Sequence, residues 1–137
     1  MPQQVRTWVL TPKTKPTSQV PDTLKADVER KAKKLVETLL KPKYIKPPPK
    51  SPEFNYIIDI WTKWHRHYFY FGATYASPGP TAISPTFESK FARLEFVGGR
   101  RFNLSYMRHT GRWFELFSRL TLDECLQRVG DDGYFLA

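Results

Sequence analysis

The sequence predicts an α+β fold, in which a five-stranded antiparallel sheet is packed by an N-terminal amphipathic helix and a short C-terminal helix. Three observations predict it. Apolar residues recur every three or four positions in residues 22–41, the apolar period changes to two from residue 54 onward, and tight-turn sequences separate the last strands. An antiparallel sheet with one face covered by the two helices is the packing that this order of elements favours.

Residues 22–41 form the predicted N-terminal helix. Spacings of four, four, three and four residues place five apolar side chains on one helix face, namely Leu24, Val28, Ala32, Leu35 and Leu39. Val36 and Leu40 widen this apolar stripe. We expect Asp22 or Thr23 to cap the start of the helix and Pro42 to end it.

Two proline-containing segments flank this helix. Residues 1–21 are predicted to be a basic arm, and residues 42–53 a connector of the polyproline type, kept extended by lysines without a nearby acid. Ligands of SH3 and WW domains have a similar composition, so a peptide-ligand interpretation competes with that of a stiff spacer.

The sheet is predicted within residues 54–118. In its first strand, Phe54, Tyr56, Ile58 and Ile60 alternate with other residues and should share the buried face. Gly98-Gly99 and His109-Thr110-Gly111 are turn sequences, so the last three strands should form a meander. The remaining strands are expected at Tyr68–Tyr75, Phe87–Val97, Arg101–Arg108 and Arg112–Phe117.

A short helix over residues 121–129 completes the predicted domain, which spans residues 22–137. Thr121 with Glu124 three residues later is a capping-box pattern, and Gly130 fits the C-terminal cap.

The charge is concentrated in the first third of the chain. The 137 residues carry a net charge of +9, but residues 1–50 hold 12 basic and four acidic side chains, whereas residues 51–137 hold ten and nine. A single cysteine, Cys125, excludes an intramolecular disulfide, and no apolar run is long enough to span a bilayer or resembles a secretory signal. These features predict a cytoplasmic protein without a membrane partner.

The basic segments predict a non-enzymatic nucleic-acid-binding protein, with RNA favoured over DNA because no helix suited to a major groove is evident. The competing interpretation is a solvated charged surface. The residues expected to contact phosphates are Lys13, Lys15, Lys31, Lys34, Lys41, Lys43, Lys46 and Lys50, and those expected to add positioned contacts are Arg108, Arg112 and Trp113.

An aromatic run, Tyr68-Phe69-Tyr70-Phe71, directs two rings to each face of its strand. We favour burial of both faces, by the helices and the N-terminal arm, over a base-stacking platform. The arginines of the hairpin turns, among them Arg100 and Arg101, are equally consistent with phosphate contacts and with pairing to nearby carboxylates.

No catalytic motif is present, and no cofactor is predicted. His65 and His67 would share a face if their segment were a strand, and with His109 they are the weak candidates for a metal site; a solvated hairpin tip is favoured. Cys125 could pair with His109 as a nucleophile, but a buried Cys125 is favoured over that pairing.

Two alternatives to nucleic-acid binding stay open. The first is a protein-interaction or assembly module, including a homo-oligomer, that uses Trp8, the Pro47-Pro48-Pro49 segment and the aromatic sheet face. The second is a small-ligand or metal-binding protein with a pocket near His65, His67 and His109.

The segment FARLEFVGGRRFNLSYMRHTGRWFELF carries a loose family resemblance, and core positions dominate it. The matching positions are Ala92, Leu94, Phe96, Phe102, Leu104, Arg108 and Trp113, followed by Asp131, Asp132 and Phe135. Over about residues 22–137 the chain resembles a family of small bacterial proteins known only as a domain of unknown function. It departs from that family in lacking a terminal Trp-Gly and in carrying an extra N-terminal arm. The resemblance implies the same helix, antiparallel sheet and C-terminal helix, and implies no activity.

Overall fold

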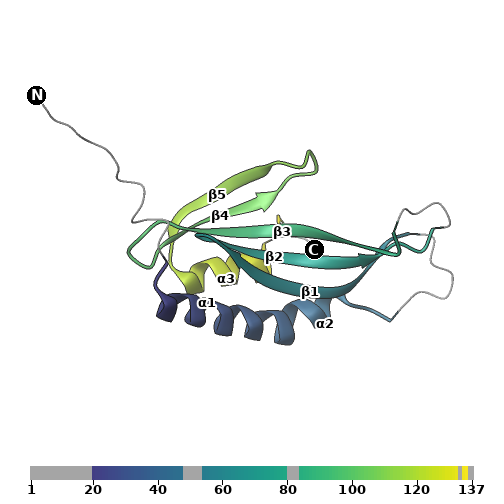
Figure 1. The fold of residues 1–137 in the computed structure, drawn as a ribbon, viewed down its shortest axis with the longest axis horizontal. Coiled ribbons are helices and arrows are strands. Elements are labelled where there is room, and N and C mark those ends of the chain that lie inside the picture. Colours follow the sequence, from purple (N-terminus) through teal and green to yellow (C-terminus); the bar gives the residue numbers. More distant parts are fainter. Residues whose placement is uncertain (1–19, 48–53, 80–83, 133, 136–137) are drawn as a thin grey trace, which may run out of the picture.

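The computed structural model describes residues 20–47, 54–79, 84–132 and 134–135, and confirms the predicted α+β fold. The five strands form one antiparallel sheet in chain order, so the meander extends over all of them (Figure 1). The strands are β1 (Tyr56–His65), β2 (Tyr68–Ala76), β3 (Thr86–Phe96), β4 (Phe102–Met107) and β5 (Trp113–Leu120).

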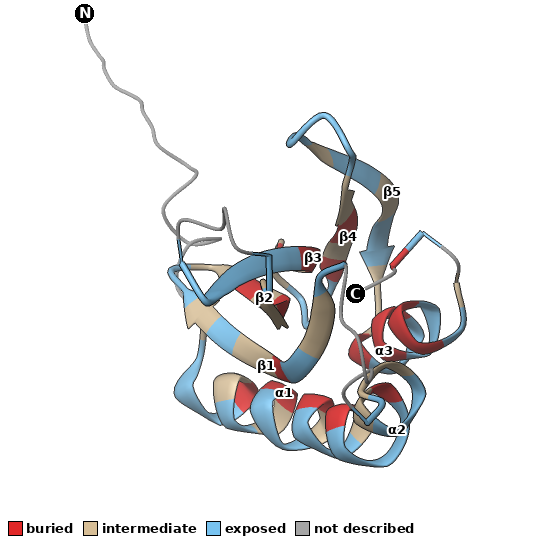
Figure 2. Ribbon diagram, turned by 90° about the vertical axis from the view of Figure 1, so that its right-hand side faces the viewer, coloured by how far each residue is buried: buried red, intermediate tan, exposed pale blue. Residues whose placement is uncertain are grey.

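The helices lie together on one side of this sheet (Figure 1). They are α1 (Asp22–Leu35), a π-helical turn η2 (Val36–Leu40), α2 (Lys41–Tyr44) and α3 (Leu122–Asp131). Figure 2 shows the buried positions of α1 along the side that faces the strands. The core therefore lies between the helices and one sheet face, where Phe69, Phe71 and Leu94 are fully buried.

The N-terminal helix differs from its prediction at both ends. Its N-cap is Pro21, and no side chain caps it, so neither Asp22 nor Thr23 has the expected role. Pro42 does not end the helix, which continues to Tyr44. The π-helical turn explains this, because the Lys41 N–H bonds to the Val36 carbonyl five residues back. That wider register accommodates a proline, which has no N–H to donate.

The first strand is also shifted from its prediction. It begins at Tyr56, Phe54 is 81% exposed, and Ile58 is exposed while Ile60 is buried. The register with β2 changes between Ile57 and Asp59, as in a β-bulge. The bulge interrupts the alternation of faces, so Ile58 does not share the buried face with Ile60.

The C-terminal helix has the predicted capping box between Thr121 and Glu124. Gly130, however, is not its cap, because the helix extends to Asp131. A Cβ at Gly130 would lie 2.8 Å from the Leu39 Cδ2 atom. This glycine therefore permits a close approach of α3 to the N-terminal helical segment.

The sheet face opposite the helices, called here the open face, has no described helix over it. The β4–β5 hairpin rises from β3 on this side and gives the face a raised wall (Figure 1). Pairing places Tyr70 beside Arg93, Arg93 beside Ser105, and Ser105 beside Glu115 across four neighbouring strands. Because side chains alternate along strands, these residues share the open face while Phe69 and Phe71 enter the core.

Candidate nucleic-acid interface

Three aromatic rings and one arginine gather on the open face. The Tyr70 ring centroid lies 5.7 Å from that of Trp113 and 6.0 Å from that of Tyr68. The Arg93 guanidinium carbon lies 4.6 Å from the Tyr68 ring centroid and 4.9 Å from that of Trp113, so the cation contacts both rings. We call Tyr68, Tyr70, Arg93 and Trp113 the aromatic–arginine cluster. All four side chains are partly exposed.

The positive charge of Arg93 has no carboxylate partner among the residues that the structure describes. Its Nε atom is buried and lacks a hydrogen-bond partner. A guanidinium usually pairs with a carboxylate or a phosphate, to which it can donate two parallel hydrogen bonds. Arg93 thus keeps unused hydrogen-bonding capacity beside partly exposed rings.

Trp61 extends the aromatic surface onto β1. Its indole Nε1 donates a hydrogen bond of 3.1 Å to the Thr74 hydroxyl oxygen on β2. A Cβ at the neighbouring Gly72 would overlap the Trp61 ring, so the indole lies directly on the backbone of β2. The glycine and the threonine together fix the orientation of this ring.

His67 borders the cluster at the β1–β2 turn. Its ring centroid is 4.2 Å from that of Tyr68, and its Nε2 atom is 3.4 Å from a Glu95 carboxylate oxygen. The ring therefore contacts the tyrosine and the carboxylate at one edge of the open face.

The open face carries both signs of charge. Strand alternation and register assign Lys63, Lys90 and Arg93 to it together with Glu88, Glu95 and Glu115. Lys90 is directed to the cluster, because its ammonium nitrogen lies 4.9 Å from the Tyr70 ring centroid. The face is thus distinguished by its rings and by Arg93, which pairs with no described carboxylate, whereas eight of the nine net positive charges of the chain belong to residues 1–50.

The lysines predicted to contact phosphates fall into three groups. Lys31 pairs with Asp123 at 3.1 Å, and Lys41 pairs with Glu37 at 2.9 Å and Asp59 at 3.4 Å. The hydrogen bond to Glu37 and the nearby carboxylates raise the pKa of Lys41. The exposed residues Lys34, Lys43 and Lys46 have no carboxylate partner among the described residues. Lys13, Lys15 and Lys50 lie outside the described residues, as do Trp8, Pro48 and Pro49.

The side chains of the three hairpin residues predicted as positioned contacts have different surroundings. Trp113 belongs to the aromatic–arginine cluster. Arg108 instead lies over Phe114, 5.3 Å from its ring centroid, and Phe114 faces away from Trp113 along the same strand. Arg112 is exposed at the hairpin tip. At the other sheet end Arg100 pairs with Asp27 at 3.4 Å and Arg101 with Glu124 at 3.9 Å.

The structure does not unite the weak metal candidates. His65 ends β1, and Arg66 turns with a φ of 57°, so His67 is not on the same strand. His109 lies in the β4–β5 turn. Within the described ranges, no three His, Cys, Asp or Glu side chains are grouped to hold a metal ion.

Cys125 is buried, as favoured, and burial raises the pKa of its thiol to about 12, which opposes thiolate formation.

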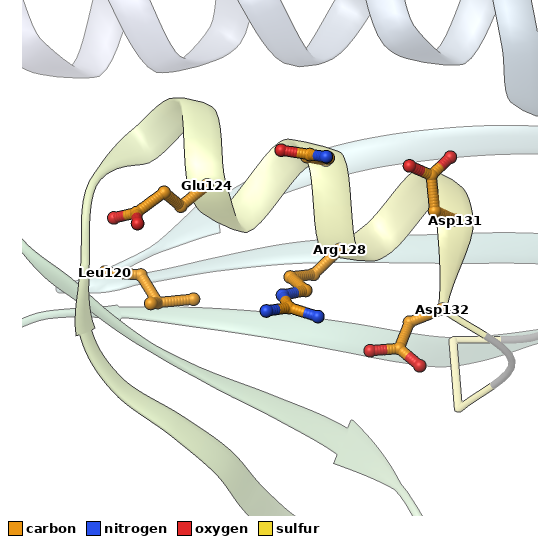
Figure 3. A pocket seen from close by; sticks show the side chains of 6 residues that line it. Leu120, Glu124, Arg128, Asp131 and Asp132 are labelled. Carbon is orange, nitrogen blue, oxygen red and sulfur yellow. The ribbon is translucent and has the colours of Figure 1, made fainter.

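A hollow of about 320 Å³ lies between the end of β5 and α3, and its charged side chains are mostly acidic (Figure 3). Glu124, Asp131 and Asp132 line it with one cation, Arg128. Arg128 stacks on Phe117, with its guanidinium carbon 4.6 Å from the ring centroid. Three carboxylates around one arginine disfavour a phosphate group here.

The sequence-based interpretation missed Arg93, Lys90 and Trp61. A signal was available for Arg93, because Ala92, Leu94 and Phe96 alternate as a buried set and leave Arg93 on the opposite face. The β-bulge opposite Gly72 hid the placement of Lys90. Nothing local indicated that Trp61 would cover Gly72.

Comparisons with known proteins give a family and no activity. Among the described helices, none has the length and apolarity needed to cross a membrane. No match to the chain was found among curated proteins or among solved structures. Residues 20–136 match the family model described as "Domain of unknown function (DUF3024)". This match spans most of the chain and the complete helix–sheet–helix unit, so the protein belongs to the DUF3024 family.

Proposed function

We propose that this protein binds single-stranded nucleic acid, with RNA favoured, and that the open face of its sheet stacks the bases. The observation that carries the proposal is the aromatic–arginine cluster, in which partly exposed rings surround an arginine that has no carboxylate partner among the described residues. Aromatic side chains and guanidinium planes are the groups on which proteins stack unpaired bases.

The aromatic residues of the covered face support the assignment of base stacking to the open face. Phe69 and Phe71 are fully buried, so the core already contains the apolar half of the aromatic run. Tyr68 and Tyr70 stay partly exposed on the open face. If that face served only for packing, phenylalanines would suit these two positions equally well. The phenol oxygens and the nearby cations make these rings suited to a polar, planar ligand.

A single strand fits the surface better than a duplex. The partly exposed rings lie on a sheet, where bases must be unstacked from one another to reach them. The helices α1 and α3 pack against the sheet, so neither offers a free recognition helix of the kind that enters a major groove. RNA is favoured because sequence-specific proteins commonly read its single-stranded segments on sheet surfaces of this kind.

Phosphate contacts would come from outside the cluster. The open face has balanced charge, whereas Lys34, Lys43 and Lys46 are exposed and the N-terminal segments add further lysines. In this arrangement the sheet supplies stacking and the first 50 residues supply most of the electrostatic attraction.

The test is a fluorescence anisotropy titration with a labelled oligouridine of about ten nucleotides at about 50 mM salt. Tyr70→Ala should weaken binding by about 1–3 kcal/mol, the value of one stacked base. Tyr134→Ala is the matched control, because Tyr134 is 57% exposed but contacts Tyr106 rather than the cluster. Its affinity should stay close to that of the unaltered protein.

The same titration at several salt concentrations tests the electrostatic part. The logarithm of the affinity should fall with the logarithm of salt by about 0.7 for each phosphate contacted. Lack of binding to RNA and to single-stranded DNA at low salt would refute the proposal. If Tyr70→Ala and Tyr134→Ala weakened nucleic-acid binding equally, the open face would not be the binding surface.

A further inference from the structure

A second hollow, of about 450 Å³, opens beside the aromatic–arginine cluster. Its wall includes Trp61 on β1, Glu88 and Lys90 on β3, and Met107 at the end of β4. The volume falls in the range of roughly 300–1,000 Å³ that small-molecule sites occupy. The hydrogen bond to Thr74 and the contact with Gly72 hold the Trp61 ring in place as one side of it.

The lining combines groups suited to a flat heterocycle. Trp61 offers a ring, and Met107 offers a polarisable thioether that packs well on rings. Glu88 is exposed and forms no ion pair with any residue that the structure describes. Lys90, two positions along, is directed to the Tyr70 ring and not to this carboxylate.

A free carboxylate determines what the hollow can accept. A phosphate group would be repelled by Glu88, whereas N–H donors would be bound by it. Guanine presents an imino N–H and an amino group side by side, and the two carboxylate oxygens can accept from both. Adenine and cytosine present one amino group beside an acceptor nitrogen, and uracil presents one N–H between two carbonyls.

We propose that this hollow binds a guanine base of the single-stranded RNA, stacked on Trp61 with Glu88 accepting from its Watson–Crick edge. The inference rests on the proposed function and adds a base preference to it. Lys90 connects the hollow with the aromatic–arginine cluster, since it lines the hollow and its ammonium group lies over the Tyr70 ring. A guanine in the hollow therefore leaves its neighbour in the chain over the aromatic–arginine cluster.

The experiment compares four labelled oligouridine probes of equal length by anisotropy, unmodified or with one central guanosine, inosine or adenosine. The guanosine probe should bind about fivefold or more tightly than the unmodified probe, as a bidentate base contact implies. Inosine, which lacks the amino group, should retain only part of this advantage. Adenosine should give little of it.

Glu88→Gln is the decisive variant, because an exposed glutamine at this position should leave folding intact. It should bring the affinity ratio of the guanosine and unmodified probes close to one, since an amide offers one acceptor in place of two. Glu115→Gln is the matched control, as an exposed acid of the same face that does not line the hollow, and it should keep the full ratio.

The outcomes separate the two proposals. Equal binding of all four probes, or a guanosine preference that persists in Glu88→Gln, would overturn the guanine site while leaving RNA binding in place. Failure of the unaltered protein to bind any of the probes would overturn both, because the base preference depends on the proposed function.

Discussion

The two faces of the sheet differ in the kind of aromatic residue that each presents. The covered face contains phenylalanines, such as Phe69, Phe71 and Phe102, that are fully buried and have no polar atom to satisfy. The open face presents tyrosine and tryptophan, and cations lie over three of its rings. One stretch of β2 supplies both kinds, because Tyr68 and Tyr70 alternate with Phe69 and Phe71.

This difference separates stability from binding within a single strand. A buried phenyl ring contributes through its removal from water, whereas a partly exposed ring with a neighbouring cation remains available to a ligand. Substitutions on the covered face should therefore lower the free energy of unfolding. Substitutions on the open face should change ligand affinity with smaller effects on stability.

The largest effect should come from Phe71→Ala. It removes a fully buried ring that contacts Phe69 and Phe91. We expect a loss of about 3–5 kcal/mol in the free energy of unfolding, measured by urea denaturation. Tyr70→Ala, the neighbouring substitution on the open face, is the comparison, and its loss should be much smaller. Equal losses would contradict the division of roles between the faces.

The next largest effect should come from Gly72→Ala, at the position where the Trp61 ring lies on the backbone of β2. The new methyl group would overlap the Trp61 ring, so the indole must move or the strands must separate. We expect destabilisation of about 1–3 kcal/mol in the same measurement. Acrylamide quenching of the tryptophan fluorescence, to which Trp61 contributes, should rise as well, because the displaced ring becomes more exposed. Gly79→Ala is the control, because a Cβ at that position would have no neighbouring atom within 4 Å.

Thr74→Val should have a smaller effect on the same ring. The substitution keeps the shape of the side chain but removes the acceptor of the Trp61 N–H. Since Trp61 is only partly buried, water can replace the lost partner, and the expected cost is about 1 kcal/mol or less. A thermal melt that shows a loss as large as that of Gly72→Ala would mean that the hydrogen bond, and not the close contact, holds the ring.

The smallest effect concerns the cap of α3 on the covered side. Hydrogen bonds with Thr121 lower the pKa of Glu124 below its ordinary value of 4.5. A lowered pKa adds stability that is fully present above pH 4.5 and is lost as the pH falls through the lowered value. The stability difference between the unaltered protein and Glu124→Gln should therefore shrink on acidification. Urea denaturation at neutral and at acidic pH measures it, and a constant difference would exclude this role.

The fold was largely predictable because its signals are local. Alternating apolar residues, such as Ala92, Leu94 and Phe96, indicate a strand with one buried face wherever the register is regular. The errors arose where the register is irregular. A bulge displaced Ile58, and a π-helical turn allowed the helix to pass Pro42. Neither irregularity leaves a local signature in composition or period.

The candidate site was less predictable because it depends on pairing between distant segments. Lys31 and Lys41 resembled free phosphate contacts, yet Asp123 and Asp59 partner them from other elements. Trp113 was predicted as a positioned contact because of its place in a hairpin, whereas its place in the aromatic–arginine cluster comes from its contact with Arg93. Sequence spacing does not reveal such contacts.

The order of the strands has a consequence for how the chain folds. Each strand pairs with the next one along the sequence, so the sheet can grow one hairpin at a time, with only short loops to close. The approach of Gly130 to Leu39 joins the two ends of the domain and has a far greater sequence separation. We therefore expect the strands to assemble early and rapidly, and the docking of the two helices to be the late step that converts a partly open sheet into the native protein.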